Sequence, residues 1–283
     1  MSAKLTEFMV QNYAKAVTMD LAEWLSLNPL PSFCEPKSDG FRVFVFKSND
    51  KILLATRHGG IYSESTHPIL FRKIETLKAP ELPQRIIFDG EYIAPDQLHI
   101  FDLLRIDDRD LMSQILLERK KILSELLSGE RKSFEVPSVL ANSFQEIQDY
   151  KKSEVSKDGE GIIVKNPSSF YRQKNSWLKL KRFDTLDCFV TGIERTQEME
   201  RTGVPHSWYM GIFDENDRVL EIGKVGTYLK DVDPSRINIG TVVEVQYQQF
   251  TEDKKLRGPF IIKIRDDKTK EECKISQIPG YSN

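Results

Sequence analysis

The stretch EPKSDGFR, residues 35–42, carries a lysine, Lys37, directly before the tripeptide Ser-Asp-Gly. An alternating apolar run, VFVF, follows at once, so the pattern predicts a tight turn that leads into a strand. A lysine in such a turn is ordinarily a solvated surface residue. It could instead be a nucleophile, because partial burial and neighbouring cations favour the uncharged amine.

Other charged residues stand at the ends of predicted strands, where a hydrophobic core has no use for them. FDGE places Glu91 after a glycine turn, and GEGIIVK places Glu160 before a strand and Lys165 at its end. In SWLKLKR, Lys179 and Lys181 alternate with leucines and so share one strand face. Carboxylates can hold a divalent metal and lysines can bind phosphates, so the set could serve phosphoryl transfer. Each residue alone is more simply a turn or surface residue.

Hydrophobic periodicity predicts the elements that would position these residues. Helices are predicted over residues 4–27 and 111–127, and Ser143 and Glu146 at capping-box spacing predict a third helix. Strands are predicted at RVFVFK, KILLATR, RIIFDGEYI, LHIFDLL, GIIVKN and SWLKLKR.

After Arg182 the pattern changes to short strands separated by turns: LDCFVTGI, WYMGIF, VLEIGKVG, TVVEVQYQQF and PFIIKIR. This spacing is typical of a small closed β-barrel. We therefore predict an α+β fold with a first domain over residues 1–182 and a barrel domain over residues 183–283. The charged segment 194–206 is predicted to be a long exposed hairpin loop.

Composition limits the classes of function. The net charge of the 283 residues is −2, so a nucleic-acid partner would have to be held by local basic patches. Cys34, Cys188 and Cys273 lack CxxC spacing, which indicates a reducing compartment rather than a disulfide framework or a zinc site. The N-terminus is charged throughout, and no apolar run reaches membrane-spanning length. We expect a cytoplasmic monomer without a membrane partner, associated with the nucleoid if the source is prokaryotic.

Taken in order, these fragments resemble the motifs of the covalent nucleotidyltransferase superfamily, which contains ATP-dependent DNA ligases, RNA ligases and mRNA capping enzymes. The resemblance covers the chain from about residue 35 to residue 268. KSDGFR matches the KxDGxR motif, which assigns Lys37 as the nucleophile. The later motifs assign, in chain order, Arg57 in TRHG, Glu91 in FDGE, Phe101 in IFDLL, Glu160 and Lys165 in EGIIVK, Lys179 and Lys181 in WLKLK, and Arg265 and Lys268 in RGPFIIKIRDDK.

The resemblance implies that Lys37 attacks the α-phosphorus of ATP to give a lysyl–AMP phosphoramidate and pyrophosphate. Only about one free lysine in 10³ is uncharged at neutral pH. The cations Lys165, Lys179, Lys181 and Arg42 would favour the amine and also bind the triphosphate, and we assign Lys179 and Lys181 to catalysis together with Lys37.

The resemblance also implies a divalent metal, Mg²⁺ or Mn²⁺, held by Glu91 and Glu160. In the family, the residue at Glu91 also contacts the ribose, and the aromatic residue at Phe101 stacks on the adenine. Glu35 lies where the family's chain contacts the base, and Arg57 is assigned to nucleotide binding.

The remaining assignments leave alternatives open. Asp39 would either orient the turn through its own backbone or act near the 3′-hydroxyl of the acceptor. Arg42 would reach the ribose of the nucleotide or the acceptor phosphate. Arg265 and Lys268 would orient pyrophosphate when the barrel domain closes, with a hinge at residues 182–184.

Several features favour DNA as the acceptor. Residues 165–182 contain lysines and arginines but no acidic residue, which suits a phosphate backbone. The barrel resembles an OB-fold, a common nucleic-acid platform. SWLKLKRFDTLDCFVTGI, LEIGKVGTYL and IRDDK resemble DNA ligase segments. We therefore predict a minimal two-domain ATP-dependent DNA ligase that seals 5′-phosphate/3′-hydroxyl nicks in duplex DNA during repair, replication or recombination.

Two other interpretations compete. An RNA ligase or an mRNA capping guanylyltransferase would use the same Lys37 chemistry on another acceptor, and a capping enzyme would take GTP. A non-catalytic OB-type binding module would form no covalent nucleotide adduct. Many cellular DNA ligases also carry a large helical DNA-binding domain before the nucleophile. At most about 30 residues precede the nucleophile region in this sequence, so we expect a minimal ligase, and how it would hold the duplex stays open.

Overall fold

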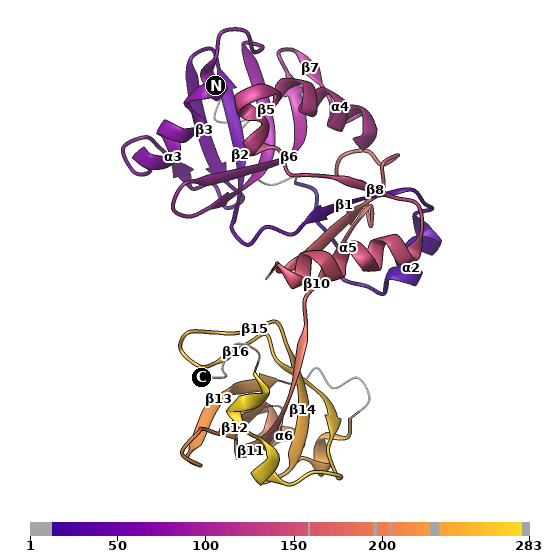
Figure 1. Ribbon diagram of the computed structural model, residues 1–283, viewed down its shortest axis with the longest axis vertical. Coiled ribbons are helices and arrows are strands. Elements are labelled where there is room, and N and C mark those ends of the chain that lie inside the picture. Colours follow the sequence, from indigo (N-terminus) through magenta and orange to yellow (C-terminus); the bar gives the residue numbers. More distant parts are fainter. Residues whose placement is uncertain are drawn as a thin grey trace. The chain divides into compact units, whose positions relative to one another are not determined.

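The computed structural model describes two compact units, Met1–Lys181 and Arg182–Asn283 (Figure 1). The described residues are 13–157, 159–194, 197–203, 205, 207–226 and 232–278. The strand ladders of both units are antiparallel, and helices pack on the sheets of the first, so the predicted α+β class is confirmed. Within the described part of the chain, none of the helices combines the length and the apolar character needed to span a membrane.

A six-stranded sheet forms one layer of the first unit. Its strands in spatial order are β4 (Ile61–Tyr62), β3 (Lys51–Thr56), β2 (Phe41–Ser48), β5 (Arg85–Ile93), β6 (Gln97–Ile106) and β7 (Arg109–Asp110). In β2, Val43 and Val45 pack on one face, whereas Phe44 and Phe46 pack on the other, because successive side chains of a strand alternate. The sheet is therefore buried on both faces at β2.

Helices cover the valine face of this sheet. Leu70 of α3 (Pro68–Lys73) and Leu123 of α4 (Leu116–Leu126) belong to the same buried cluster as Val43. Two 3-10 helices, η1 (Ile74–Lys78) and η2 (Gly129–Phe134), complete this layer. The helix predicted over residues 111–127 is confirmed for Leu116–Leu126 and wrong for residues 111–115, which are not helical.

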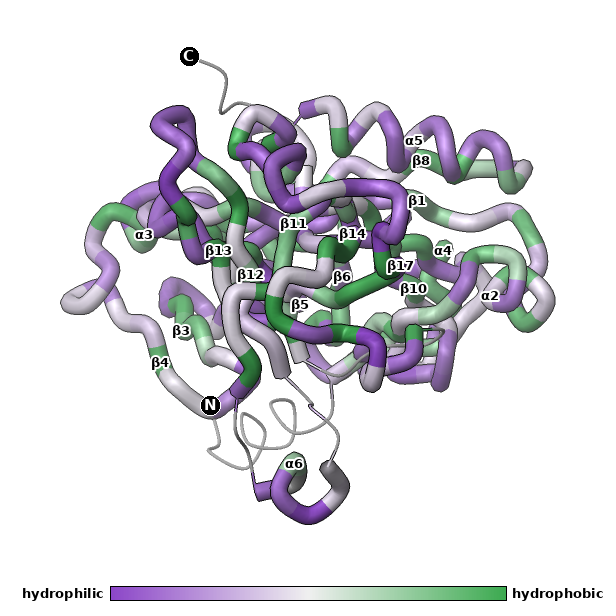
Figure 2. Tube along the Cα trace, turned by 90° about the horizontal axis from the view of Figure 1, so that it is seen from below, coloured by the Kyte–Doolittle hydropathy of each residue, from purple (hydrophilic) through white to green (hydrophobic). Residues whose placement is uncertain are grey.

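A second sheet of the first unit has the order β10 (Trp177–Lys181), β9 (Gly161–Lys165), β1 (Ser32–Pro36) and β8 (Val139–Ala141). It packs against α2 (Leu21–Leu27) and α5 (Phe144–Ser156) through Trp24 and Ile147. Figure 2 shows α5 as a mainly hydrophilic helix with interspersed hydrophobic residues, and Ile147 is its buried residue. The capping box of α5 is only half formed. The Ser143 hydroxyl accepts from the Glu146 N–H, but the Glu146 carboxylate accepts from the Asn142 N–H.

The predicted helix over residues 4–27 is wrong for residues 13–20, and residues 4–12 lie outside the described residues. The Val17 N–H donates to the Trp177 carbonyl at 2.8 Å, and its carbonyl accepts from the Lys179 N–H at 3.0 Å, so this segment runs along β10. The helix begins only at Leu21, where the Asp20 carboxylate accepts two backbone N–H groups. We name residues 13–20 the N-terminal strap.

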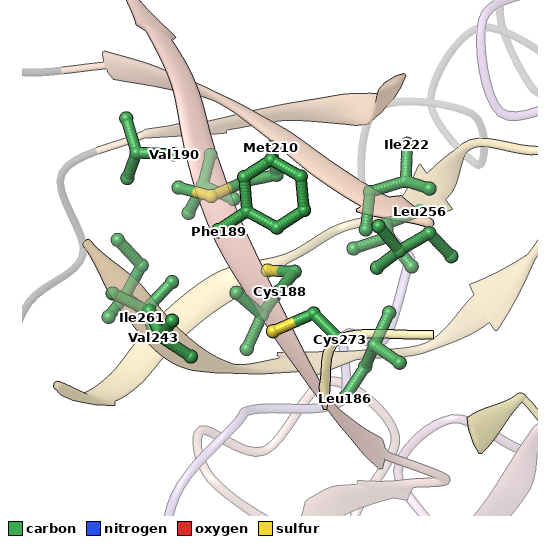
Figure 3. Close-up of a cluster of buried hydrophobic side chains, with 14 of the residues drawn as sticks. Leu186, Cys188, Phe189, Val190, Met210, Ile222, Val243, Leu256, Ile261 and Cys273 are labelled. Carbon is green, nitrogen blue, oxygen red and sulfur yellow. The ribbon is translucent and has the colours of Figure 1, made fainter. Parts of the chain in front are cut away.

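The second unit is built on a five-stranded antiparallel sheet. Its strands in spatial order are β13 (Val219–Gly226), β12 (Ser207–Phe213), β11 (Asp184–Ile193), β14 (Val242–Tyr247) and β17 (Phe260–Ile264). The short elements are β15 (Gln249–Phe250), β16 (Leu256–Arg257), η3 (Pro234–Arg236), η4 (Lys270–Glu272) and η5 (Ile275–Gln277). Figure 3 shows its core, where Cys188 and Cys273 lie among aliphatic side chains as free, buried thiols.

The predicted segment 194–206 does connect two antiparallel neighbours, β11 and β12, as a hairpin loop would, but its described part includes a helix that was not predicted. A short helix, α6 (Gln197–Thr202), stands between β11 and β12, and residues 195, 196, 204 and 206 lie outside the described residues. A six-residue helix is too short to show an amphipathic pattern in the sequence.

Candidate active site

Lys37 lies in the short segment between β1 and β2. Its backbone N–H donates to the Gly161 carbonyl at 2.9 Å, which fixes it beside the start of β9. Its Nζ contacts Oε2 of Glu160, and the side chain is about 20% exposed. Gly40 closes the segment, because a Cβ there would lie 2.3 Å from the Tyr92 carbonyl oxygen. The backbone contacts of Lys37 and Gly40 therefore fix the segment from which the partly exposed amine projects.

Two cavities of the first unit meet at Lys37. The smaller, of about 120 Å³, has a mixed aromatic and polar lining that includes Glu35, Phe101, Val136, Lys165 and Trp177. The larger, of about 570 Å³, is lined by apolar, polar and charged residues, and all of the charged ones except Glu91 are cations, among them Lys15, Arg57 and Lys179. An apolar pocket with a few convergent polar groups suits a flat base, and a cationic opening suits phosphates. We name them the base pocket and the phosphate cavity.

Glu35 is buried in the wall of the base pocket between two lysines. Its Oε2 lies 2.5 Å from Nζ of Lys165, and its Oε1 contacts Nζ of Lys120 and accepts from the Ser138 hydroxyl at 2.9 Å. Burial alone would raise the pKa of the Glu35 carboxyl. The attraction of the two ammonium groups together exceeds this effect, so the pKa is lowered. Burial also lowers the pKa of Lys165 to about 8.

Aromatic rings enclose the ammonium group of Lys165. Its Nζ lies 4.0 Å from the ring centroid of Trp177 and 4.7 Å from that of Phe101. The two rings meet edge to face at 6.0 Å. Phe101 is thus in the base pocket, as expected for a stacking residue, and Trp177 adds an aromatic wall.

Arg42 lines both cavities, but its guanidinium is already engaged. Nε and Nη2 bind the two Asp89 oxygens at 2.9 and 2.5 Å, and Nη1 donates to the Ala14 carbonyl at 2.5 Å. Asp89 also accepts from the Tyr171 hydroxyl at 2.7 Å. Arg42 therefore ties the N-terminal strap to β5. Its predicted contact with ribose or acceptor phosphate stays a prediction.

Glu91 lines both cavities from within β5, directly opposite Arg42 of β2. The predicted glycine turn before it is wrong. Gly90 is a strand residue, required because a Cβ would lie 2.6 Å from the His99 carbonyl oxygen of β6. Burial raises the pKa of Glu91 to about 7, although the charges of Arg42 and Lys37 act in the opposite direction.

Glu160 is the carboxylate nearest the predicted nucleophile. Besides its contact with Lys37, its Oε1 lies 3.9 Å from Nζ of Lys181. Lys179 lines the phosphate cavity together with Arg57, whose Nε donates to Nε2 of His58 at 2.9 Å. The structure thus brings most of the motif residues of the first unit around Lys37.

The other predicted site residues are Asp39, which lines neither cavity, and Arg265 and Lys268 of the second unit. Asp39 is exposed beside Lys37, and its neighbour Ser38 hydrogen-bonds to Nδ1 of His99 at 2.8 Å. In the second unit, Arg265 lies 2.7 Å from Asp187 Oδ1, and Lys268 contacts Oδ2 of the same carboxylate. Both cations therefore share one acidic partner.

The motifs did not assign three residues at or behind the base pocket: Trp177, which lines it, and Lys120 and Ser138, which contact Glu35 in its wall. Lys120 sits in the charged run ERKK of α4, where a lysine reads as a solvated helix residue. Trp177 is the first residue of WLKLK, where it reads as an ordinary core aromatic. Only the three-dimensional approach of α4 to β1, more than 80 positions apart in the chain, would have identified Lys120.

The carboxylates suit a bound Mg²⁺ or Mn²⁺ in one specific way. Among the described residues, no group of three or more His, Cys, Asp or Glu side chains could hold a metal ion. Mg²⁺ is usually held by one or two carboxylates together with substrate phosphates and water. Glu91, which lines both cavities, and Glu160, which contacts Lys37, therefore fit a metal whose remaining ligands come from a nucleotide.

The raised pKa of Glu91 gives a test by stability. Between about pH 4.5 and pH 7 the native state keeps a proton that the unfolded state releases, so the stability from this group is lost as the pH rises through 7. We expect Glu91→Gln, measured by thermal unfolding without divalent ions, to gain about 1–3 kcal/mol relative to the native chain at pH 8 compared with pH 4.5. An unchanged difference at the two pH values would show that the carboxyl of Glu91 is not buried as described.

Comparison with protein families relates the chain to one enzyme group. The family model described as "ATP dependent DNA ligase domain" matches residues 94–181. DNA ligase 2 of Methanosarcina acetivorans is 26% identical over 87% of this chain, and the DNA ligase of Thermococcus fumicolans is 23% identical over 87%. Each alignment covers 54% of the relative, so the chain spans about half the length of these curated proteins. The DNA ligase of Methanocorpusculum labreanum is 32% identical over 47% of this chain and 24% of its own.

Solved structures share the fold. The structure named Pmar-Lig_Pre is 18% identical, with a TM-score of 0.68 over 94% of this chain and 71% of its own. A structure from the analysis of Lig E DNA ligases is 15% identical, with a TM-score of 0.62 over 90% of this chain and 99% of its own. At such low identity the likeness establishes the fold of the chain.

Proposed function

Because this chain is related to the ATP-dependent DNA ligases, we propose that it forms a covalent lysyl–AMP at Lys37 and uses it to seal 5′-phosphate/3′-hydroxyl nicks in duplex DNA. The observation that carries the proposal is the position of Lys37. Its amine lies where the base pocket meets the phosphate cavity, in contact with Glu160. A nucleotide with its base in one and its phosphates in the other presents its α-phosphorus to this amine.

The first step joins Nζ of Lys37 to the α-phosphorus and breaks the bond to the β-phosphate oxygen, which leaves as pyrophosphate. Nζ loses its proton in this step, and Glu160, in contact with Nζ, orients the amine and can take the proton. Negative charge that develops on the phosphoryl oxygens faces Lys179 and Arg57 in the phosphate cavity. The DNA 5′-phosphate then takes AMP from Lys37, and the 3′-hydroxyl displaces AMP.

Mg²⁺ or Mn²⁺, held by Glu91 and Glu160 together with the nucleotide phosphates, would supply countercharge to the phosphoryl oxygens. Phe101 and Trp177 exclude water from the base and offer ring surface to it, and Glu35 and Lys165 supply the polar contacts of the same pocket. Lys181, whose Nζ lies 3.9 Å from Oε1 of Glu160, places a further cation beside this carboxylate.

We infer that the second unit is an OB-type barrel. Its five antiparallel strands have the order β13-β12-β11-β14-β17, and the outer strands β13 and β17 also approach each other, as closure requires. Such barrels bind nucleic acids, which supports DNA as the acceptor in repair, replication or recombination.

Labelling with radioactive ATP or GTP, followed by denaturing electrophoresis, tests the first step. We expect a covalent label from ATP in the presence of Mg²⁺. Preferential labelling by GTP would instead indicate capping chemistry, and no label with either nucleotide would indicate a non-catalytic binding module.

Matched nicked substrates test the acceptor. We expect sealing of a nick in duplex DNA with ATP and Mg²⁺, and slower sealing when both nick-flanking strands are RNA. Faster sealing of the RNA nick would overturn DNA as the acceptor while leaving the lysyl–AMP chemistry in place.

A further inference from the structure

Lys120 is an unusual lysine, because it is buried within α4. It is 7% exposed, whereas lysines are almost never fully buried unless they are paired. Its Nζ contacts Oε1 of Glu35. The preceding residue, Arg119, fixes this turn of α4 to β6, because its Nε and Nη2 each lie 2.8 Å from an oxygen of Asp102. The backbone of Lys120 is therefore fixed where its side chain reaches Glu35, in the wall of the base pocket.

The contacts of Glu35 leave little freedom to its carboxylate. Oε1 contacts Nζ of Lys120 and accepts a hydrogen bond from the Ser138 hydroxyl, and Oε2 contacts Nζ of Lys165. Oε2 is therefore the oxygen with remaining capacity to accept a hydrogen bond, because each carboxylate oxygen has about two acceptor positions. Removing Lys120 would free Oε1 and let the carboxylate rotate out of this orientation.

The groups that face Glu35 come from four elements. They are Lys120 of α4, Lys165 of β9, Ser138 before β8 and Tyr150 of α5, and Cys34 is its neighbour in β1. Burial raises the pKa of Cys34 to about 12 and also raises the pKa of Tyr150, so both side chains are uncharged at neutral pH. The two lysines are therefore the cations that keep Glu35 ionised. Both lysines also act on a second buried carboxylate, Asp102, which is paired with Arg119.

We propose that Lys120 is a positioning residue of the nucleotide site, which holds Glu35 ionised and oriented so that Oε2 accepts an N–H group of the bound base. This inference rests on the proposed function. The exocyclic amine of adenine donates hydrogen bonds, whereas guanine carries an acceptor oxygen at that position. An ionised, fixed Glu35 therefore favours adenine, and Lys120 acts on this preference through Glu35.

The test compares Lys120→Met with Lys120→Arg and with Lys121→Met. Lys121 is the matched control, because it is the next residue of α4 and its side chain is 60% exposed. For Lys120→Met we expect the KM for ATP in covalent labelling to rise about 10-fold or more, since a hydrogen bond to a charged group contributes about 1.5–3 kcal/mol. The labelling rate at saturating ATP should stay within about twofold, because Lys37 and Glu160 are untouched. Lys120→Arg should restore most of the affinity, and Lys121→Met should not change it.

The pH profile separates positioning from general damage to the fold. With one cation removed, Glu35 takes up a proton at higher pH, so the KM of Lys120→Met should rise steeply as the pH falls from 7.5 to 5.5, while that of the native chain stays nearly flat. The preference for ATP over GTP should shrink over the same range. A folded Lys120→Met protein with native KM and a flat profile would overturn the proposal.

A second variant covers the case in which Lys120→Met does not fold. In the Glu35→Gln background the lysine has no carboxylate to hold, so adding Lys120→Met should restore stability and cost less than twofold further in ATP affinity. An independent, additive loss would contradict action through Glu35.

Binding of ATP to Lys37→Ala variants, measured by calorimetry, needs no covalent step. If Lys37→Ala binds ATP and the Lys120 effect is seen while the native chain forms no adduct, the proposed function fails and the positioning role stands; if no variant binds nucleotide, both are wrong.

Discussion

Replacing Lys37 by alanine is expected to abolish the covalent ATP adduct and the sealing of nicks. The amine of Lys37 forms the nitrogen–phosphorus bond, and no other described lysine lies both at the junction of the two cavities and in contact with Glu160. Removal of a covalent nucleophile costs about 10⁶ in rate in other enzymes, so we expect a loss of at least about 10⁴. The rate of adduct formation under single-turnover conditions measures it.

The controls for this prediction address folding and the later steps. Lys152→Ala, an exposed lysine of α5, should label normally. Lys37→Arg should be as inactive as Lys37→Ala, because a guanidinium stays protonated and cannot act as the nucleophile. A nick that already carries a 5′-adenylate should still be sealed by Lys37→Ala. If that reaction is also lost in a folded protein, Lys37 has a role beyond transfer of the nucleotide.

Replacing Asp102 by alanine is expected to cause the largest loss of stability. Asp102 and Arg119 are both completely buried, and the guanidinium binds the carboxylate through two contacts of 2.8 Å. Without Asp102 the charge of Arg119 has no such partner, which costs about 3–5 kcal/mol in comparable buried pairs. Chemical denaturation of the chain measures this loss. Adduct formation should also slow, because the pair holds α4 and Phe101 of β6 in place.

Two comparisons isolate the buried pair. Asp108→Ala breaks an exposed pair with Arg85, and we expect a change within about 1 kcal/mol. Replacing both partners, as Asp102→Leu with Arg119→Met, should recover most of the stability lost in Asp102→Ala, because no uncompensated charge remains. An equal loss in the double variant would show that packing, rather than charge, determines the effect.

The fold was predictable where hydrophobic alternation was long and regular. β2, β5, β6 and α4 lie where the pattern places them. β1 was not predicted, because its sequence SFCEP is short, follows Pro31 and ends in Pro36, so the local pattern gives no strand signal. The helix expected before residue 21 fails for a related reason. Its spacing is helical, but the backbone of Val17 finds partners on β10 instead.

The clustering of the candidate site residues was predictable from short sequence motifs. Lys37 and Glu91 line both cavities, Phe101 and Lys165 line the base pocket, and Lys179 lines the phosphate cavity. Their surroundings were not predictable, since they depend on contacts between distant segments. Arg42 is bound by Asp89 and the N-terminal strap, and Glu35 is held by a lysine from α4. No spacing in the chain encodes either pairing.

Peptide mapping by mass spectrometry after incubation with ATP and Mg²⁺ tests whether Lys37 is the nucleophile. We expect one adenylyl group per chain, attached to the peptide that contains Lys37. The group should be stable to base, released by acid as a phosphoramidate is, and removed on addition of pyrophosphate. An adenylyl group on another residue, or none on a folded chain that binds ATP, would show that Lys37 is not the nucleophile.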